Sequence, residues 1–181
     1  MGKMSIERVR KEMGLMEKIM SYIPGYRGYK EKEIRRETDI LVRRKISGIL
    51  AEARSMLNSP LGPSEARKLA YDQESRFALE NIRTSLDKVS QRIDKAVAGY
   101  AGLFDAVKIR EDKLDAVISH DLSLIEKAES IKAIVSDLFS KNIGTPEWKN
   151  TLTGLISAVR ELDQLIDERI ELLEGLSEVS G

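Results

Sequence analysis

The chain has 181 residues, of which 41% are hydrophobic and 33% charged, and it contains 30 basic residues, 30 acidic residues and no cysteine. This composition excludes an intrinsically disordered chain, and the length suits one domain with a substantial core. Without cysteine there is no disulfide, thiolate metal site or cysteine nucleophile. No apolar run approaches the roughly 18 residues of a membrane span, and the first residues do not show the pattern of a signal peptide. We therefore expect a cytoplasmic protein with a single helical domain over residues 1–181.

The charge is unevenly distributed along the chain. Residues 1–58 carry a net charge of +6, and residues 59–181 carry −6. Two interpretations fit this pattern. Basic helices from the first part could pack beside acidic helices of the same chain or of a second copy, or they could form a basic face for a polyanion.

Residues 4–21 are predicted to form an amphipathic N-terminal helix. Its apolar residues recur every three or four positions and fall within a stripe about 80° wide, which suits one neighbour. The stripe consists of Ile6, Val9, Met13, Met16 and Met20. Methionine makes an adaptable apolar surface, which could dock on the protein's own bundle, on a partner or second subunit, or on lipid. Acidic residues interleave with the basic ones on the polar face, and this mixture disfavours anionic lipid.

The following segment contains a turn and the start of a second helix. Pro24-Gly25 is the pattern of a type II turn, with Ile23 and Tyr26 as its outer residues. The second helix is predicted from near Tyr29 to about Leu57, and the bundle as a whole from about residue 28 to residue 177. Two prolines and a glycine then mark residues 58–63 as a loop.

Three further helices are predicted from apolar periodicity. The third begins near Ser64 and reaches residues 99–102, which form either a tight turn or part of a continuous helix. The fourth covers about 104–141, with a break near 119–123 as an alternative, because Ser123 and Glu126 have capping-box spacing. The fifth begins with Thr145 as N-cap and Pro146 at the first helical position, and it ends at Gly175.

The period of the apolar positions also predicts which residues face the core. The expected core residues of the last four helices are Ile34, Thr38, Leu41 or Val42, Ile46, Ile49, Ala53, Met56 or Leu57, Leu69, Ile82, Leu86, Val89, Ile93, Val97, Val107, Leu114, Val117, Ile118, Ile125, Ile131, Val135, Leu138, Trp148, Leu152, Leu155, Val159, Leu162, Ile166, Ile170 and Leu173. The fold class is therefore all-α, and we expect an elongated antiparallel helical bundle of four long helices, similar to a coiled coil, with an additional N-terminal amphipathic helix.

Several kinds of catalytic site lack the residues that they need. A di-iron site requires Glu-x-x-His on two helices, but His120 is the only histidine and residue 117 is Val. No glycine-rich phosphate loop follows a predicted strand. His120 is expected to be a solvated side chain at a helix break. We therefore expect no catalytic residue, metal ligand or cofactor, and we predict that the protein is not an enzyme.

The strongest candidate for a binding surface is the aromatic-basic segment 26–45. Three of the five tyrosines lie within residues 22–29, and residues 27–45 contain eight basic and four acidic residues. The candidate partner or anion contacts are Tyr26, Arg27, Tyr29, Lys30, Lys32, Arg35, Arg36, Arg43 and Arg44. The rings could stack on unpaired bases while the cations meet phosphates.

Two observations favour a structural role for the same segment. Glu31–Arg35 and Asp39–Arg43 stand four residues apart with the acid first, so that intrahelical pairing can neutralise part of the basic charge. The tyrosine rings can also pack over the end of the bundle and fix the first helix against the second.

The segment from Pro24 to Asp39 resembles a P-G-Y-x-G-Y-K-x-K-E-x-R-R-E-x-D signature of uncharacterised prokaryotic helical proteins. The resemblance covers about residues 22–44 and implies no activity. From the residues themselves we expect a non-enzymatic helical interaction or scaffold protein that binds a protein partner or self-associates as a homodimer. The alternative is nucleic-acid or other polyanion binding through segment 26–45.

Overall fold

The computed structural model describes residues 2–95 and 111–177, and all the regular secondary structure in these ranges is helical. The helices are α1 (Gly2–Tyr22), the short 3-10 helix η1 (Lys32–Ile34), α2 (Arg35–Leu57), α3 (Pro63–Tyr71), α4 (Gln73–Lys95), α6 (Glu111–Ser140) and α7 (Pro146–Ser177). The all-α fold class is therefore confirmed. The expected turn at residues 99–102 and the core positions Val97 and Val107 lie outside the described residues.

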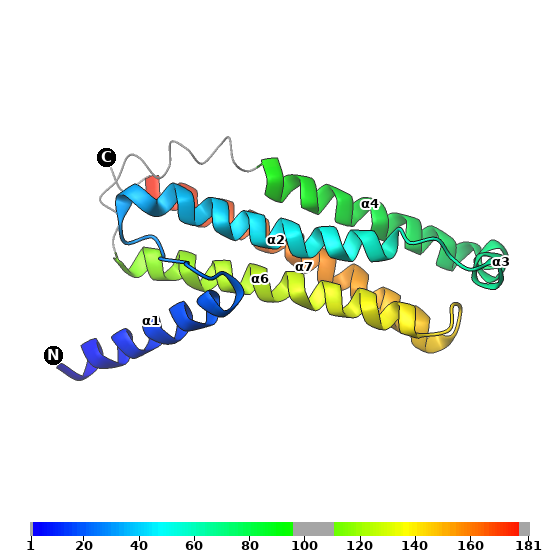
Figure 1. Ribbon diagram of the computed structural model, residues 1–181, viewed down its shortest axis with the longest axis horizontal. Helices are drawn as coiled ribbons and strands as arrows, with labels where there is room; N and C mark the ends of the chain where they lie inside the picture. Colours follow the sequence, from blue (N-terminus) through cyan, green and yellow to red (C-terminus); the bar gives the residue numbers. More distant parts are fainter. Residues whose placement is uncertain (1, 96–110, 178–181) are drawn as a thin grey trace.

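Helices α2, α4, α6 and α7, which we call the core helices, lie side by side along the length of the molecule (Figure 1). Helix α2 packs against α4 and α6, and α7 packs against the same two helices. Consecutive helices such as α6 and α7 run in opposite directions, but the neighbours α2 and α6 run in the same direction (Figure 1). Helix α1 packs against α6, and its N-terminal end points away from the core helices.

The predicted apolar stripes form the core. Leu86 of α4, Ile125 of α6 and Leu162 of α7 are all fully buried. The other expected residues in the described ranges are also buried, except that Ile34, Leu41, Met56 and Ile170 are partly exposed. Burying each large aliphatic side chain contributes about 1.5–3 kcal/mol, so these stripes dominate the stability of the fold.

The predicted third helix is divided at Asp72 into α3 and α4, so the expectation of one continuous helix from Ser64 was wrong. The Asp72 side chain accepts hydrogen bonds from the Ser75 N–H at 3.1 Å and from the Ser75 hydroxyl at 2.7 Å, so it caps α4. Lys149 of α7 lies 2.9 Å from the same carboxylate, and these contacts, led by the Lys149 hydrogen bond, lower the pKa of Asp72 to about 2. The break lets α3 lie across the end of the core helices and bury Leu69.

Helix α6 is continuous from residue 111 to residue 140, so the alternative break near 119–123 is wrong. The Ser123 hydroxyl donates to the Ser119 carbonyl at 3.1 Å within the helix instead of capping a new one. His120 is half-buried, and its Nε2 lies 2.6 Å from the Leu165 carbonyl of α7. The expectation of a solvated histidine at a helix break was therefore wrong, because the side chain joins two packed helices.

The predicted start of α7 is confirmed. The Thr145 hydroxyl accepts a hydrogen bond from the Trp148 N–H at 3.3 Å, and Pro146 occupies the first helical position. No helix in the described ranges is both long enough and apolar enough to cross a membrane.

Candidate functional site: the aromatic corner and helix α1

The predicted type II turn connects α1 to the rest of the molecule. The Tyr26 N–H donates to the Ile23 carbonyl at 3.1 Å, and Gly25 has a φ of 84°. The chain remains non-helical until η1, so α2 begins at Arg35 and not near Tyr29 as predicted. The Gly28 carbonyl accepts a hydrogen bond from the Thr38 hydroxyl at 2.8 Å, which fastens this connection to the first turn of α2.

Tyr26 and Tyr29 form what we call the aromatic corner, and both of their rings are buried. Tyr26 is 1% exposed and Tyr29 is fully buried, and the rings meet edge to face with centroids 6.4 Å apart. Neither ring therefore presents a face on which a base could stack. This geometry favours the structural interpretation, in which the rings hold α1 and its turn against the core helices.

Below the rings lies a buried ionic network contributed by four distant parts of the chain. Arg169 of α7 donates to Asp121 of α6 at 2.8 Å and to Asp39 of α2 at 2.7 Å. The Tyr29 hydroxyl donates to Asp121 at 2.5 Å and accepts from Arg169 at 3.2 Å. Arg43 donates to Asp39 at 2.8 Å. Two guanidinium groups thus face two carboxylates, and each of these four residues is at most 6% exposed.

Burial controls the protonation of this network. Burial, reinforced by the nearby Asp121 carboxylate, raises the pKa of Tyr26 and of Tyr29, so both phenols stay neutral at alkaline pH. Burial also raises the pKa of Asp121, although Arg169 opposes this shift. The charged groups of the network pair with one another and are covered by side chains. The network therefore holds the turn after α1 against α2, α6 and α7.

The predicted basic contacts have different environments. Arg27 pairs with Glu31 at 2.9 Å, and Lys30 pairs with Glu12 of α1 at 2.8 Å. The buried Arg35 donates to the Tyr29 carbonyl at 2.7 Å. Arg43 lies in the buried network, in the Asp39–Arg43 pair predicted from the spacing.

The other three predicted contacts are Arg36, Arg44 and Lys32. Arg36 and Arg44 are exposed and form no ion pair with another described residue. The side chain of Lys32 lies outside the described part of the structure. Among the predicted cations whose side chains are described, Arg36 and Arg44 are therefore available to an anion.

The network includes Asp121 and Arg169, which the sequence analysis did not select. Both occupy apolar-stripe positions: Asp121 follows Ile118 by three residues, and Arg169 follows Ile166 by three. A charged residue in a core stripe is seldom stable unless it is paired, and this signal could have identified them. In the described ranges no group of three or more histidine, aspartate or glutamate side chains is arranged to hold a metal ion.

Comparison with known proteins finds no matching family. No protein-family model, curated protein or solved structure matches the chain. Functional inference therefore rests on the geometry of the molecule itself.

Helix α1 packs with a different face from the one that its sequence predicted. Ile19 is fully buried, and Leu15 and Met16 are partly buried, whereas Met13 is 57% exposed and Met20 is 41% exposed. At 100° per residue, the packed face is rotated from the predicted stripe by roughly a quarter of a turn. The side chains of Ile6 and Val9 lie outside the described part. Met13 and Met20 define what we call the open methionine face.

A groove of about 390 Å³ lies beside the open methionine face, between α1, the connection 27–30 and α6. Met16, Gly28 and Ile118 contribute apolar lining, and Met13 lies at the same groove. Gly28 has a φ of 73°, and a Cβ there would lie 3.4 Å from the Met16 sulfur. The groove and the open methionine face together make a largely apolar surface on the outside of α1.

Proposed function

We propose that the protein is a non-enzymatic helical interaction protein that self-associates through the open methionine face of α1. The exposure of Met13 and Met20 carries this proposal, since these two methionines lie on one side of α1 and the described part of the chain does not cover them. The methionine side chain is flexible and polarizable, which suits a surface that adapts to a partner helix.

A second copy of the chain is the partner that the observations favour. The formal net charge is zero, so long-range repulsion does not oppose the approach of two copies. A face used by both copies forms a two-fold interface in which one patch meets itself, the commonest arrangement in soluble oligomers. A lipid surface is less suitable, because Glu12 and Glu17 lie on the same helix as Lys11 and Lys18.

Sedimentation equilibrium tests this proposal directly. The unmodified protein is expected to self-associate, and Met13→Glu is expected to shift it to monomer by placing a carboxylate in the interface. Phe77→Glu is a matched control, because Phe77 is 69% exposed and lies on α4, away from α1. A strictly monomeric unmodified protein, or equal effects of the two substitutions, would contradict the proposal.

The proposal also has a structural part: the core helices form an elongated four-helix bundle, and the chain is a single domain with α1 attached to it. The contacts form a closed ring, in which α2 packs against α4, α4 against α7, α7 against α6 and α6 against α2, and this ring supports the arrangement. A single cooperative transition in urea, coincident for tryptophan fluorescence and helical circular dichroism, is expected of one domain. Two separated transitions would contradict it.

Polyanion binding through segment 26–45 remains the second candidate, supported by Arg36 and Arg44, which are exposed and pair with no acid among the described residues. Phosphate contacts weaken steeply with salt. Fluorescence anisotropy with single-stranded and duplex probes at about 50 and 200 mM salt tests this candidate. Arg36→Gln/Arg44→Gln should remove any binding that uses these two cations.

A further inference from the structure

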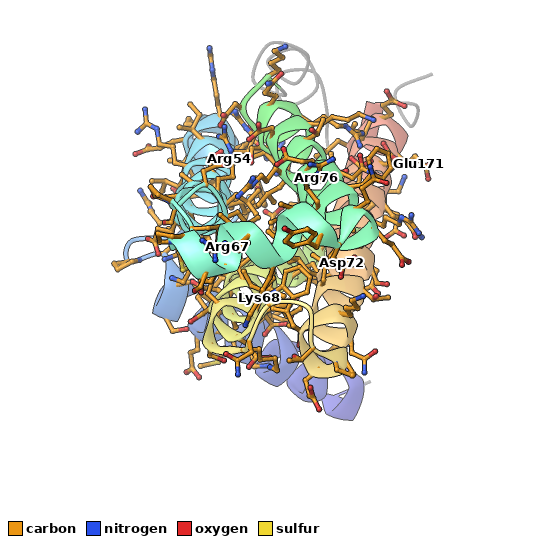
Figure 2. All side chains as sticks on the ribbon, turned by 90° about the vertical axis from the view of Figure 1, so that its right-hand side faces the viewer. Arg54, Arg67, Lys68, Asp72, Arg76 and Glu171 are labelled. Carbon is orange, nitrogen blue, oxygen red and sulfur yellow. The ribbon has the colours of Figure 1, made fainter. Side chains whose placement is uncertain are left out.

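The end of the molecule opposite α1 carries an exposed aromatic and basic surface that the sequence analysis did not select. Figure 2 looks onto this end and shows α3 lying across it. Arg67 and Lys68 lie on α3, Asp72 between α3 and α4, and Arg76 on α4. Tyr71, the last residue of α3, is 88% exposed. We call Arg67, Lys68, Tyr71 and Arg76 the α3 end surface.

Helical geometry places these side chains on the outward side of α3. Leu69 is buried against the core, and at 100° per residue Ser64, Arg67, Lys68 and Tyr71 fall within about 100° on the opposite side. Arg67 and Tyr71 stand four residues apart, so they are neighbours on the helix surface. The outward side of α3 therefore combines one ring with two cations.

The cations of this surface have no acidic partner in the described part of the chain, whereas the nearby acids are engaged. Arg67, Lys68 and Arg76 are exposed and form no ion pair with another described residue. The Glu65 carboxylate accepts the Gly62 N–H at 2.9 Å, and Asp72 is held by Ser75 and Lys149.

The remaining acid, Glu74, lies close enough to Lys149 to interact with it electrostatically. The positive charge of the α3 end surface is therefore less neutralised than the composition of residues 63–76 indicates. That composition contains three basic and three acidic residues.

We propose that the α3 end surface binds single-stranded nucleic acid, with Tyr71 stacking on a base and Arg67, Lys68 and Arg76 contacting phosphates. Exposed aromatic rings beside cations are the combination that single-strand binding proteins use. A membrane surface fits less well, because the outward side of α3 carries no large aliphatic side chain to enter a bilayer. The proposal is independent of self-association through α1.

Fluorescence anisotropy with a fluorescein-labelled strand of about twelve deoxythymidines tests this proposal. Three phosphate contacts on a single strand predict a salt slope of about −2, so affinity should fall about 20-fold between about 50 and 200 mM salt. Arg67→Gln/Lys68→Gln should lower the slope to about −0.7. Tyr71→Ala should weaken binding at least about fivefold, whereas Tyr71→Phe, which keeps the ring, should bind like the unmodified protein.

Three controls separate this site from the alternatives. Arg36→Gln/Arg44→Gln changes cations in the N-terminal half of α2, away from α3, and should leave binding intact, and Met13→Glu should do the same. Co-sedimentation with phosphatidylserine vesicles tests the membrane alternative. No binding to the strand at about 50 mM salt, equal loss in the Arg36/Arg44 variant, or vesicle binding that needs Tyr71 without strand binding would each overturn the proposal.

Discussion

Arg169 is shared by two buried carboxylates on different helices. It donates to Asp39 of α2 and Asp121 of α6, and all three side chains are nearly inaccessible to water. A buried ion pair adds little net stability when it is intact, but removing one partner leaves an uncompensated charge in the core. The stability lost on a substitution in this network therefore depends on which charged groups stay buried without a partner.

We predict that Arg169→Met destabilises the protein by about 3–5 kcal/mol, because two carboxylates would remain buried without their shared cation. Urea unfolding measures the change. Arg160→Met is the matched control on the same helix, where the arginine is exposed, and it should change stability by no more than about 0.5 kcal/mol. Equal effects of the two substitutions would show that the network is not formed.

The two corner tyrosines offer a second comparison at this scale. Tyr29→Phe removes a hydroxyl that bonds Asp121 and Arg169, and it should cost about 1.5–3 kcal/mol, as expected for hydrogen bonds to charged groups. The buried Tyr26 hydroxyl has no hydrogen-bond partner among the described residues, so Tyr26→Phe should be neutral or slightly stabilising. Urea unfolding measures the stability of both variants. Similar losses of stability in the two would contradict the different hydrogen bonding of the two hydroxyls.

At the scale of single residues, the sequence predicted the core well and the buried polar groups poorly. Leu155 and Val159 repeat with the helical period, which depends only on the residues of one helix. Asp39–Arg43 was also predicted, because both partners lie on one helix. The pairing of Asp121 with Arg169 depends on how two helices meet, and no local pattern contains that information.

At the scale of elements, glycine has opposite roles in the aromatic corner and in the helices. Gly28 has a φ of 73°, in the left-handed region, and it packs close to Met16 and Ile118. Gly48 lies within α2, and a Cβ added there would meet no neighbouring side chain within 4 Å. Replacement by alanine should therefore change the stability of the protein in opposite directions at the two positions.

Gly28→Ala is predicted to destabilise the protein by about 1–2 kcal/mol, because an L side chain is strained at positive φ. Gly48→Ala is predicted to stabilise it by roughly 0.5–1 kcal/mol, through the higher helix propensity of alanine. Thermal unfolding by circular dichroism measures both. Loss of stability at Gly48, or no loss at Gly28, would contradict the assigned backbone conformations.

Element boundaries were predicted where capping chemistry was recognised. Thr145-Pro146 identified the start of α7, and Pro24-Gly25 identified the turn after α1. Asp72 was missed although two signals mark the break: aspartate is a strong N-cap, and on one continuous helix Leu69 would lie about 140° away from Ile82. The packed face of α1 was also misjudged, because Ile19 lies beside the methionine stripe and both faces are apolar.

At the scale of the whole molecule, the buried phenols predict how stability responds to alkaline pH. The pKa values of Tyr26 and Tyr29 are raised above 10.0 in the folded protein. Above about pH 10 the unfolded chain loses these protons while the folded protein keeps them, so stability falls as pH rises. Each phenol contributes a slope of about −1.4 kcal/mol per pH unit in that window, and the contribution is absent below it.

We therefore predict that Tyr26→Phe makes the alkaline loss of stability shallower by about 1.4 kcal/mol per pH unit. Urea unfolding at several pH values between about 9.5 and 11.5 measures the difference between variant and unmodified protein. Lysine residues titrate in the same range, but they are common to both proteins and cancel. An unchanged slope would show that Tyr26 ionises while the protein remains folded.

The ionic network joins positions that are synthesised far apart in time. Tyr29 and Arg169 are separated by 140 positions, and Asp39 and Arg169 by 130. Folding generally begins at the N-terminus during translation. Helix α1, its turn and α2 therefore leave the ribosome long before Arg169 has been synthesised. Such long-range contacts form late and slow folding. The aromatic corner is therefore expected to become fixed only when α7 docks, and a nascent chain that stops before Arg169 would leave Asp121 without its guanidinium partner and Asp39 paired with Arg43 alone.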